Sequence, residues 1–278
     1  MKRPILVAAA MSVAALASGL VLMTASSVAA SSLPTLTLAL TSKTITVGGS
    51  MLSGAVNVVT TVTGEKSDGP LLILLKPGVT PAELDKGVGA IGPTSPFDVI
   101  DPYGSIVFDG FATEGAPSTA ETWLQPGTYI AGENGNGQAV FTVTQSATPA
   151  LLPAPGATVT AIDFAFRGAS TLHDGELVRF KNDGYLIHMF AFEQAKSLAD
   201  AKLAEQGILS GKCNGGGQCK QYGTGVKGLF AGPLSHAELQ QEVVNEPPGV
   251  YVIVCLMNAE DGREHDQLGM FRTITIVK

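Results

Sequence analysis

Residues 246–270 read EPPGVYVIVCLMNAEDGREHDQLGM, and this stretch decides the fold. A Pro-Gly turn leads into the apolar run VYVIV, which is typical of a β-strand, and the run FRTITIV over residues 271–277 predicts a second, closing strand. The polar loop between the two strands carries Cys255, His265 and Met270, in a chain with only three Cys and four His. The stretch therefore predicts two adjacent strands joined by a loop rich in metal-ligating side chains.

Short apolar runs of the same kind recur along the rest of the chain. Gly, Pro, Asn and Asp turns separate them, and helix signals are few. The runs include LTLALTSKTITV, AVNVVTTVTG and LLILL before residue 146, and TVTAIDFAF, ELVRFKN and HMFAF after it. Short strands at this spacing predict an all-β fold, a sandwich or a barrel.

The N-terminal segment, residues 1–30, has the features of an export signal. It has a basic tip, Lys2-Arg3, then a long uncharged apolar run, and it places Val28 and Ala30 at the −3 and −1 positions of a signal-peptidase site. The run is also long enough to be an uncleaved membrane anchor. We expect cleavage and an exported protein, periplasmic or extracellular, with no membrane span left after the signal is removed.

Length and charge bound the remaining chain. Removing 30 of the 278 residues, and their two positive charges, leaves 248 residues and changes the formal charge from −7 to −9. That length suits one large domain or two of about 100–125 residues. A mildly acidic chain without a Lys/Arg cluster argues against nucleic acid and against anionic membrane surfaces as partners.

A Pro-rich segment divides this chain almost evenly. Residues 147–156 read ATPALLPAPG and contain three prolines without a period, as a linker does. Two domains are therefore expected, residues 31–146 and residues 157–278. In the second, KSLADAKLAEQ (196–206) predicts a helical insertion that ends at Gly207, with Leu198 and Leu203 on one side. SHAELQQEVV (235–244) has a possible capping box but is interpreted as a strand.

The two halves resemble each other in the order of their elements. Pro126-Gly127-x-Tyr129 matches Pro248-Gly249-x-Tyr251, and the turn Ser67-Asp68-Gly69 matches Asn182-Asp183-Gly184. Aligned on the tyrosines, Cys255 corresponds to Glu133. His188, further upstream, corresponds to Leu71 or a residue near it. The sandwich itself thus does not require the four candidate ligands, because they occur in one half only.

His188, Cys255, His265 and Met270 form a coherent ligand set. Two imidazoles, one thiolate and a weak axial thioether suit a copper ion that alternates between Cu(I) and Cu(II). One loop supplies three of the four, and His188 comes from another strand, just after a predicted turn. Taken singly, each residue also fits an ordinary core position, because Cys and Met are common in cores.

On these residues the second half resembles a cupredoxin, a blue copper domain. That family has an N-x(n)-H segment and, near the C-terminus, a C-x(n)-H-x4-M loop. This chain has NDGYLIH at 182–188 and C-x9-H-x4-M at 255–270. The resemblance covers about residues 157–278 and reaches the first half only through the repeat. It implies two tandem Greek-key β-sandwich domains, the first of them without metal ligands.

The resemblance also implies roles for the four residues. His188 and His265 would be nitrogen ligands, Cys255 the thiolate and Met270 the axial thioether of one type 1 copper ion. The nine-residue spacer between Cys255 and His265 is longer than in the smallest blue copper proteins and close to that of the blue site in copper nitrite reductases.

The other two cysteines, Cys213 and Cys219, flank a Gly-rich loop. In an exported protein such a pair predicts a local disulfide, and a second metal site is the less favoured alternative because no His lies nearby. The pairing leaves Cys255 single, which fits a thiol reserved for a metal.

The number of histidines helps to distinguish a copper enzyme from an electron carrier. Multicopper oxidases and copper nitrite reductases are also built from cupredoxin domains, but a trinuclear centre needs eight imidazoles, and a nitrite reductase needs three beyond its blue site. Outside the ligand set only His173 and His236 are left, both expected to face solvent. Those enzymes also place a His beside the blue-site Cys, whereas here the neighbours are Val254 and Leu256.

We therefore expect a non-enzymatic carrier of single electrons whose redox partner the sequence does not identify. Copper storage or delivery, and a non-catalytic binding module with a vestigial or different metal site, are the alternatives. Electron carriage predicts an edge of His265 close to solvent, ringed by apolar residues, whereas storage predicts slow or absent redox cycling.

Overall fold

The computed structural model describes residues 33–278, apart from residues 65, 89–96, 133–136, 213–218 and 220–221. Residues 33–278 form one compact unit. The expected signal peptide, residues 1–30, lies outside the described residues and stays a prediction. None of the described helices combines the length and the apolar character needed to cross a membrane.

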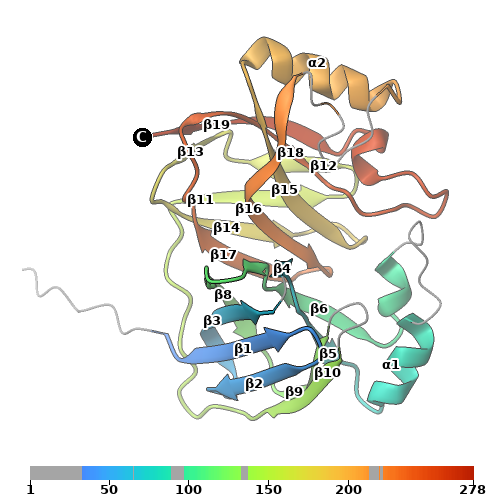
Figure 1. The fold of residues 1–278 in the computed structure, drawn as a ribbon. Coiled ribbons are helices and arrows are strands. Elements are labelled where there is room, and N and C mark those ends of the chain that lie inside the picture. Colours follow the sequence, from blue (N-terminus) through green and yellow to red (C-terminus); the bar gives the residue numbers. More distant parts are fainter. Residues whose placement is uncertain (1–32, 65, 89–96, 133–136, 213–218, 220–221) are drawn as a thin grey trace, which may run out of the picture. The chain divides into compact units, whose positions relative to one another are not determined.

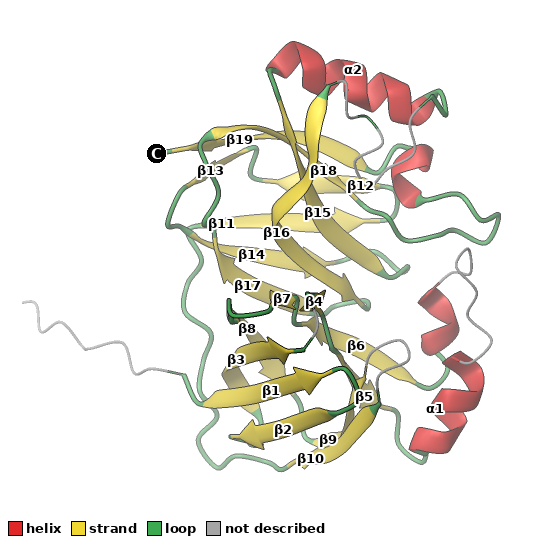
Figure 2. Cartoon of the chain, viewed as in Figure 1, coloured by secondary structure: helices red, strands yellow, loops and turns green. Residues whose placement is uncertain are grey.

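β-strands dominate the described chain (Figures 1 and 2). In the first half, β8-β3-β1-β2 lie in one sheet, β10-β9-β5-β6 form a second, and β4 and β7 form a short ribbon. Helix α1 (Pro81–Val88) and the 3-10 helix η1 (Phe97–Ile100) lie between β5 and β6. The strands are β1 (Thr35–Thr41), β2 (Ile45–Gly49), β3 (Gly54–Thr63), β4 (Ser67–Asp68), β5 (Leu71–Leu75), β6 (Gly104–Asp109), β7 (Ala112–Thr113), β8 (Ser118–Leu124), β9 (Gly127–Gly132) and β10 (Gln138–Val143).

The second half has the same plan. Its strands β12-β11-β14-β17 continue the first sheet, and β13-β19-β18-β15-β16 form another. Helix α2 (Leu198–Leu209) follows β15, and the 3-10 helix η2 (His265–Leu268) precedes β19. The strands are β11 (Ala157–Ile162), β12 (Ala165–Gly168), β13 (Thr171–His173), β14 (Leu177–Asn182), β15 (His188–Ala195), β16 (Gly223–Leu234), β17 (Leu239–Val243), β18 (Gly249–Val254) and β19 (Phe271–Val277).

Alternating side chains bury one face of each sheet. In β1 the leucines at 36, 38 and 40 are buried and the residues between them are exposed, as the two-residue period of a strand requires. In the second half Phe180 of β14 packs against Phe190 and Phe192 of the facing sheet, with ring centroids 5.1 and 5.9 Å apart. Each core thus lies between two sheets, and the predicted all-β sandwich with a short helix is confirmed.

Strand order relates the two halves. β8-β3-β1-β2 corresponds to β17-β14-β11-β12, and β10-β9-β5-β6 corresponds to β19-β18-β15-β16. The tyrosines of the two Pro-Gly turns also act alike. The hydroxyl of Tyr129 donates to the carbonyl of Gln125 at 3.0 Å, and that of Tyr251 to the carbonyl of Pro247 at 2.7 Å, four residues back in both cases.

Strand register corrects one part of the alignment. Leu71 lies opposite Gly132 in β9, and Ala191 lies opposite Val254 in β18. Position 71 therefore corresponds to Ala191, and by count His188 corresponds to Asp68 rather than to Leu71. The sequence alignment misplaced the residue that corresponds to His188, because the apolar run LLILL has no internal feature that fixes its register.

The two halves join through equivalent strands. β8 pairs with β17 antiparallel, with Glu121 opposite Gln241, and the hydroxyl of Thr122 donates to the carbonyl of Leu239 at 2.8 Å. Antiparallel pairing of equivalent edge strands is the arrangement expected about an approximate two-fold axis. Residues 145–156 form no helix or strand, in keeping with the predicted linker, while the division into two domains stays a prediction.

Helix α2 differs from its prediction at both ends. Ser197 caps it, accepting from the amide of Asp200, and the helix continues through Gly207 to Leu209. Gly211, with φ +67°, is the left-handed residue after the end, so the predicted stop at Gly207 was wrong. Leu198 and Leu203 are exposed, and the helix buries its small residues and Ile208 instead.

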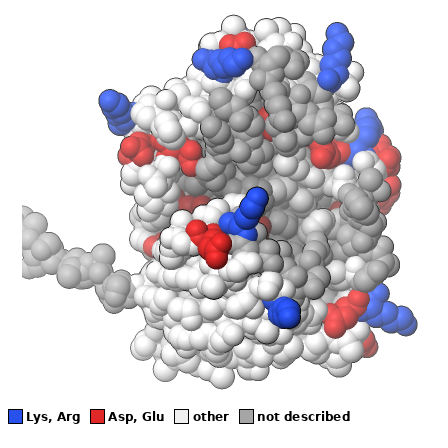
Figure 3. All heavy atoms as spheres, viewed as in Figure 1, with Lys and Arg blue, Asp and Glu red and all other residues white. Residues whose placement is uncertain are grey.

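Segment 235–244 is a strand, as predicted, but a shorter one. β17 begins only at Leu239, and a turn precedes it in which the amide of Glu238 donates to the carbonyl of Ser235. On the face drawn in Figure 3, Lys and Arg side chains are scattered singly among Asp and Glu.

Candidate metal centre

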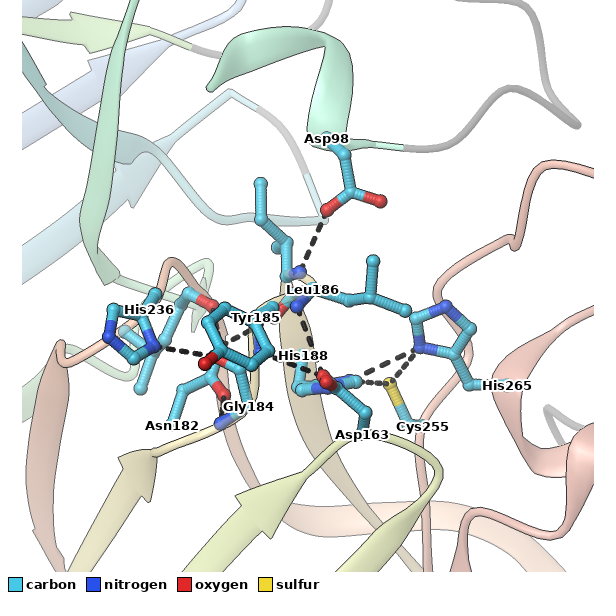
Figure 4. Close-up of polar contacts among 12 residues, drawn as sticks. Asp98, Asp163, Asn182, Gly184, Tyr185, Leu186, His188, His236, Cys255 and His265 are labelled. Carbon is cyan, nitrogen blue, oxygen red and sulfur yellow. Dashed lines mark hydrogen bonds and ion pairs between the residues drawn. The ribbon is translucent and has the colours of Figure 1, made fainter. Parts of the chain in front are cut away.

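Three of the predicted ligands meet in the second half (Figure 4). The Nδ1 atoms of His188 and His265 lie 3.2 Å apart, and the Sγ atom of Cys255 lies 3.7 Å from the first and 3.5 Å from the second. All three side chains are fully buried. Residues 77 positions apart in sequence thus bring two nitrogens and one sulfur to a single point.

The size of this triangle fits a metal ion. A point equidistant from the three atoms lies about 2.0 Å from each, within the range of roughly 2.0–2.3 Å at which imidazole nitrogen and thiolate sulfur bind a four-coordinate ion. A trigonal set of two His and one Cys with a distant thioether is the donor set of blue copper sites. The group fits a single type 1 copper ion.

Backbone hydrogen bonds hold His265 close to Cys255, although the two residues lie at opposite ends of a nine-residue spacer. The amide of Asp266 donates to the carbonyl of Cys255 at 3.0 Å, and the amide of His265 donates to the carbonyl of Met257 at 2.8 Å. Cys255 follows directly on β18, so the central strand fixes its position. The amide of Met189 in β15 donates to its Sγ at 3.4 Å.

The nine-residue spacer folds into a turn of its own. Asn258 and Glu264 form an isolated β-bridge, and the amide of Ala259 donates to the carbonyl of Arg263 at 2.8 Å. An exposed ion pair of 2.6 Å joins Arg263 to Asp261 at the tip. The extra length therefore projects outward and leaves the two ligands at its base side by side.

Met270 lies next to both ligands of the loop. Its amide donates to the carbonyl of His265 at 2.9 Å, and its carbonyl accepts from the amide of Cys255 at 3.2 Å. Gly269, with φ +101°, ends η2 in the left-handed conformation that turns the chain into β19. The Met270 side chain is fully buried, and its role as the axial thioether stays a prediction.

Asn182 holds the segment that carries His188. Its Oδ1 accepts from the amide of Gly184 at 2.9 Å, and its Nδ2 donates to the carbonyls of Leu186 and Leu234, both at 2.8 Å. This fully buried side chain makes the predicted Asn-Asp-Gly turn and ties it to the end of β16.

The remaining ring nitrogen of His188 meets a carboxylate. Its Nε2 lies 3.2 Å from Oδ1 of Asp163, so a neutral imidazole that donates there leaves Nδ1 free to bind a metal. Gly184 makes the approach possible, since a Cβ at that position would lie 2.5 Å from the Asp163 oxygen and 2.9 Å from Nε2.

Burial favours neutral groups in the metal-free site. It raises the pKa of Cys255 to about 12 and lowers the pKa of His265 to about 4. It also lowers the pKa of His188, although Asp163 opposes the effect. Both imidazoles are therefore unprotonated at neutral pH and ready to bind, and a cation is needed to stabilise the thiolate.

His265 differs from its prediction. The electron-carrier hypothesis expects a solvent-near edge, but the side chain is fully buried, and its Nε2 has no hydrogen-bond partner among the described residues. Phe164 covers it edge-on, with ring centroids 5.2 Å apart. The sequence gives no signal for this cover, because Phe164 lies in a turn 101 residues upstream of His265. The first half also contributes a residue near the site.

That contribution comes from Asp98 in η1, whose Oδ1 accepts from the amide of Ile187 at 2.9 Å, one residue before His188 (Figure 4). Asp98 also lines, with Phe164, Leu186 and Leu268, a groove of about 550 Å³. The first half therefore contacts the segment that presents His188.

The other predicted residues lie outside this group. His173 and His236 are exposed, as predicted, and the ring of His236 stacks on Tyr185 at 5.6 Å. Cys255 is free and buried. Cys219 is buried, but Cys213 lies outside the described residues, so their disulfide stays a prediction.

Comparisons with known proteins add only distant likenesses. No protein-family model and no curated protein matches the chain. Among solved structures, auracyanin B matches 46% of this chain and 94% of its own, at 15% identity and a TM-score of 0.28. Auracyanin A from Chloroflexus aurantiacus, described as a "blue" copper protein, matches 43% of this chain and 96% of its own, at 18% identity and a TM-score of 0.24.

A copper nitrite reductase from Nitrosomonas europaea matches 88% of this chain and 93% of its own, at 11% identity and a TM-score of 0.22. The similar structures thus include blue copper proteins and a copper enzyme. At these identities and TM-scores, none of the likenesses assigns a function to this chain.

Proposed function

We propose that this protein is an exported cupredoxin-like protein that binds one copper ion in its second half and carries single electrons. The observation that carries the proposal is the buried triangle of His188, Cys255 and His265, whose sides of 3.2, 3.5 and 3.7 Å match a metal-ligand sphere. Met270 is the proposed axial ligand.

Copper, when bound there, supplies one-electron exchange between Cu(I) and Cu(II). The chain's own residues would hold one geometry for both states, because each ligand is fixed by the backbone or by a further hydrogen bond. Asn182 anchors the His188 segment, and the amides of His265 and Asp266 anchor the loop. Little then has to rearrange on electron transfer, and the buried site excludes water.

The proposal includes no catalytic centre. Two of the four histidines belong to the triangle, and the other two, His173 and His236, are exposed. Neither the three further imidazoles of a nitrite-reducing copper nor the eight of a trinuclear centre are encoded in this chain. Substrate turnover would need an open coordination position that this donor set does not provide.

The remaining parts of the proposal are a signal segment at residues 1–30, periplasmic or extracellular location, and a disulfide between Cys213 and Cys219. A tandem arrangement of two cupredoxin-like domains is also proposed, supported by the shared strand order of the halves. The first domain would then have lost, or never acquired, the metal ligands.

One observation favours copper storage or delivery as a second candidate. His265 is fully buried and its cover includes Phe164, so a redox partner does not touch a ligand directly. Storage predicts a protein that takes up copper but exchanges electrons slowly, whereas a carrier exchanges them rapidly with small one-electron reagents.

The test is to add Cu(II) to the protein and record the visible spectrum. An intense thiolate-to-copper band that is absent in Cys255→Ala supports the copper site. Repeated reduction and reoxidation without loss of that band supports electron carriage. A protein that stays colourless and metal-free contradicts the proposal, and a colourless protein that retains Cu(I) favours storage.

A further inference from the structure

The turn between β11 and β12 contacts both imidazole ligands. It consists of Asp163 and Phe164, between the last residue of β11 and the first of β12. Asp163 lies 3.2 Å from Nε2 of His188, and the ring of Phe164 lies 5.2 Å from that of His265, nearly perpendicular to it. Two neighbouring residues thus act on two ligands that are far apart in sequence.

The backbone of Phe164 is unusual. Its φ of +58° lies in the left-handed region, where only one other described non-glycine residue, Ala237, is found. A non-glycine residue there is strained, and a glycine would avoid this strain. An aromatic side chain at this position therefore needs a compensating role, and its contact with His265 offers one.

The side chain of Phe164 links the buried ligand to solvent. His265 is fully buried, whereas Phe164 is 38% exposed. Leu186 lines the same groove as Phe164, and Figure 4 shows its side chain directed toward the His265 ring. The outer face of Phe164 takes the place of the exposed imidazole edge that electron carriage was expected to need.

Asp163 is equally well fixed. Besides His188, its Oδ1 accepts from the amides of Tyr185 at 2.8 Å and Leu186 at 3.1 Å. These two amides belong to the segment that leads into His188. The carboxylate thus sets both the path of that segment and the orientation of the imidazole at its end.

We propose that the turn Asp163-Phe164 is a positioning element for the copper centre. In it, Asp163 selects Nδ1 of His188 as the coordinating nitrogen, and Phe164 closes His265 from water and keeps an electron acceptor at a distance from this ligand. This inference rests on the proposed function. In that exchange one electron passes from the reduced centre to an external one-electron acceptor, and no bond or proton is transferred.

The cover is tested without copper, by reacting the metal-free protein with diethyl pyrocarbonate and mapping the modified histidines. Exposed His173 and His236 should react, and buried His188 and His265 should not. In Phe164→Ala, His265 should lose its protection while His188 keeps it. The matched control is Phe111→Ala, which removes another half-exposed phenylalanine, in the first half. In this variant both His188 and His265 should stay unmodified.

Histidine modification is measured without copper, so failure of this test can be distinguished from failure of the protein to bind copper. Protection of His265 in Phe164→Ala, or its modification in the unaltered protein, overturns the role of Phe164. Should Phe164→Ala unfold, Phe164→Gly replaces it, since glycine relieves the left-handed strain. In the copper-loaded protein, either variant should exchange electrons faster with a cationic cobalt(III) complex than the unaltered chain does.

The role of Asp163 is tested by the comparison of Asp163→Asn with Asp163→Ala. The amide oxygen of Asn still accepts hydrogen bonds, so its copper affinity and visible band should stay close to those of the unaltered protein. Asp163→Ala should lower copper affinity about 10–100-fold and shift the band. Equal affinities and spectra for both variants and the unaltered protein overturn the assignment.

Discussion

The first and second halves of this protein share one strand order but differ at one end of the sandwich. Between the two closing strands of the first half, β9 and β10, lie five residues, 133–137, whereas the corresponding loop between β18 and β19 has sixteen, 255–270. All the loop ligands lie in that longer connection. The shared strand order thus does not depend on the loop that carries three of the predicted ligands, whereas His188 is the first residue of strand β15.

The two halves also make different contributions to the structure. The first half contributes Asp98, which accepts from the amide of Ile187, the residue before His188, and a strand edge, β8, that pairs with β17. The second half contributes the predicted metal ligands. A change that removes only the site should leave the shared framework intact, while a change in the joint should affect the whole chain.

The largest expected effect comes from removing Asn182, which anchors the segment that carries His188. In Asn182→Ala, three hydrogen bonds of a fully buried side chain are lost, and the carbonyls of Leu186 and Leu234 lose their donor. We expect a loss of about 3 kcal/mol or more in the free energy of unfolding, together with loss of the copper band. Urea unfolding and a copper titration measure the two effects.

Its neighbour provides the control. Asp183 is 45% exposed in its side chain and pairs with Lys181 on the surface, so Asp183→Ala should change stability by no more than about 0.5 kcal/mol. Equal behaviour of the two variants would show that the turn does not hold the ligand segment.

The next effect concerns the joint between the halves. Burial in β17 raises the pKa of Glu242 to about 8, partly opposed by the Gln240 amide. Burial raises the pKa of Glu238 to about 7. A raised carboxyl pKa favours the protonated folded state, so its stabilisation is complete below pH 4.5 and is lost as pH rises toward 8.

For Glu242 the loss should be on the order of 2 kcal/mol, after allowance for partial solvent screening. Glu242→Gln, which is neutral at every pH, should flatten this decline but leave the smaller part due to Glu238. Unfolding measured at pH 4.5, 6.5 and 8.5 tests it. A variant that loses stability with pH as steeply as the unaltered chain contradicts the raised pKa of Glu242.

The smallest effect tests the likeness of the halves. Tyr129→Phe removes two hydrogen bonds to Gln125, and Tyr251→Phe removes one to Pro247. Expected losses are about 1.5 and 1 kcal/mol, without a change in the position of the copper band. Tyr185→Phe, at an 80% exposed residue, is the control. A loss in one half only would mean that the two turns are not equivalent.

Much of this arrangement could be predicted from residues. The alternation of apolar and polar residues predicted the strands. The repeated Pro-Gly-x-Tyr indicated the relation between the halves, and the spacing of Cys255, His265 and Met270 predicted the ligand loop. These are local patterns, and local patterns determine secondary structure and the residues that lie close together along one loop.

Contacts between distant segments could not be predicted in the same way. Nothing in Asp163-Phe164 marks it as a partner of both imidazoles, because the contact depends on how β11 and β12 lie beside η2. The burial of His265 follows from the same packing. The register of LLILL and the end of α2 were misjudged because apolar runs carry no register mark, and because Gly207 is a buried contact rather than a terminus.

X-ray absorption at the copper edge of the copper-loaded protein tests the central claim most directly. One copper ion per chain with two nitrogen ligands and one short sulfur ligand, at roughly 2.0–2.3 Å, is the predicted result, and the sulfur contribution should vanish in Cys255→Ala. Copper bound only through nitrogen and oxygen, or no copper at all, would contradict the assignment of the second half as the metal-binding one.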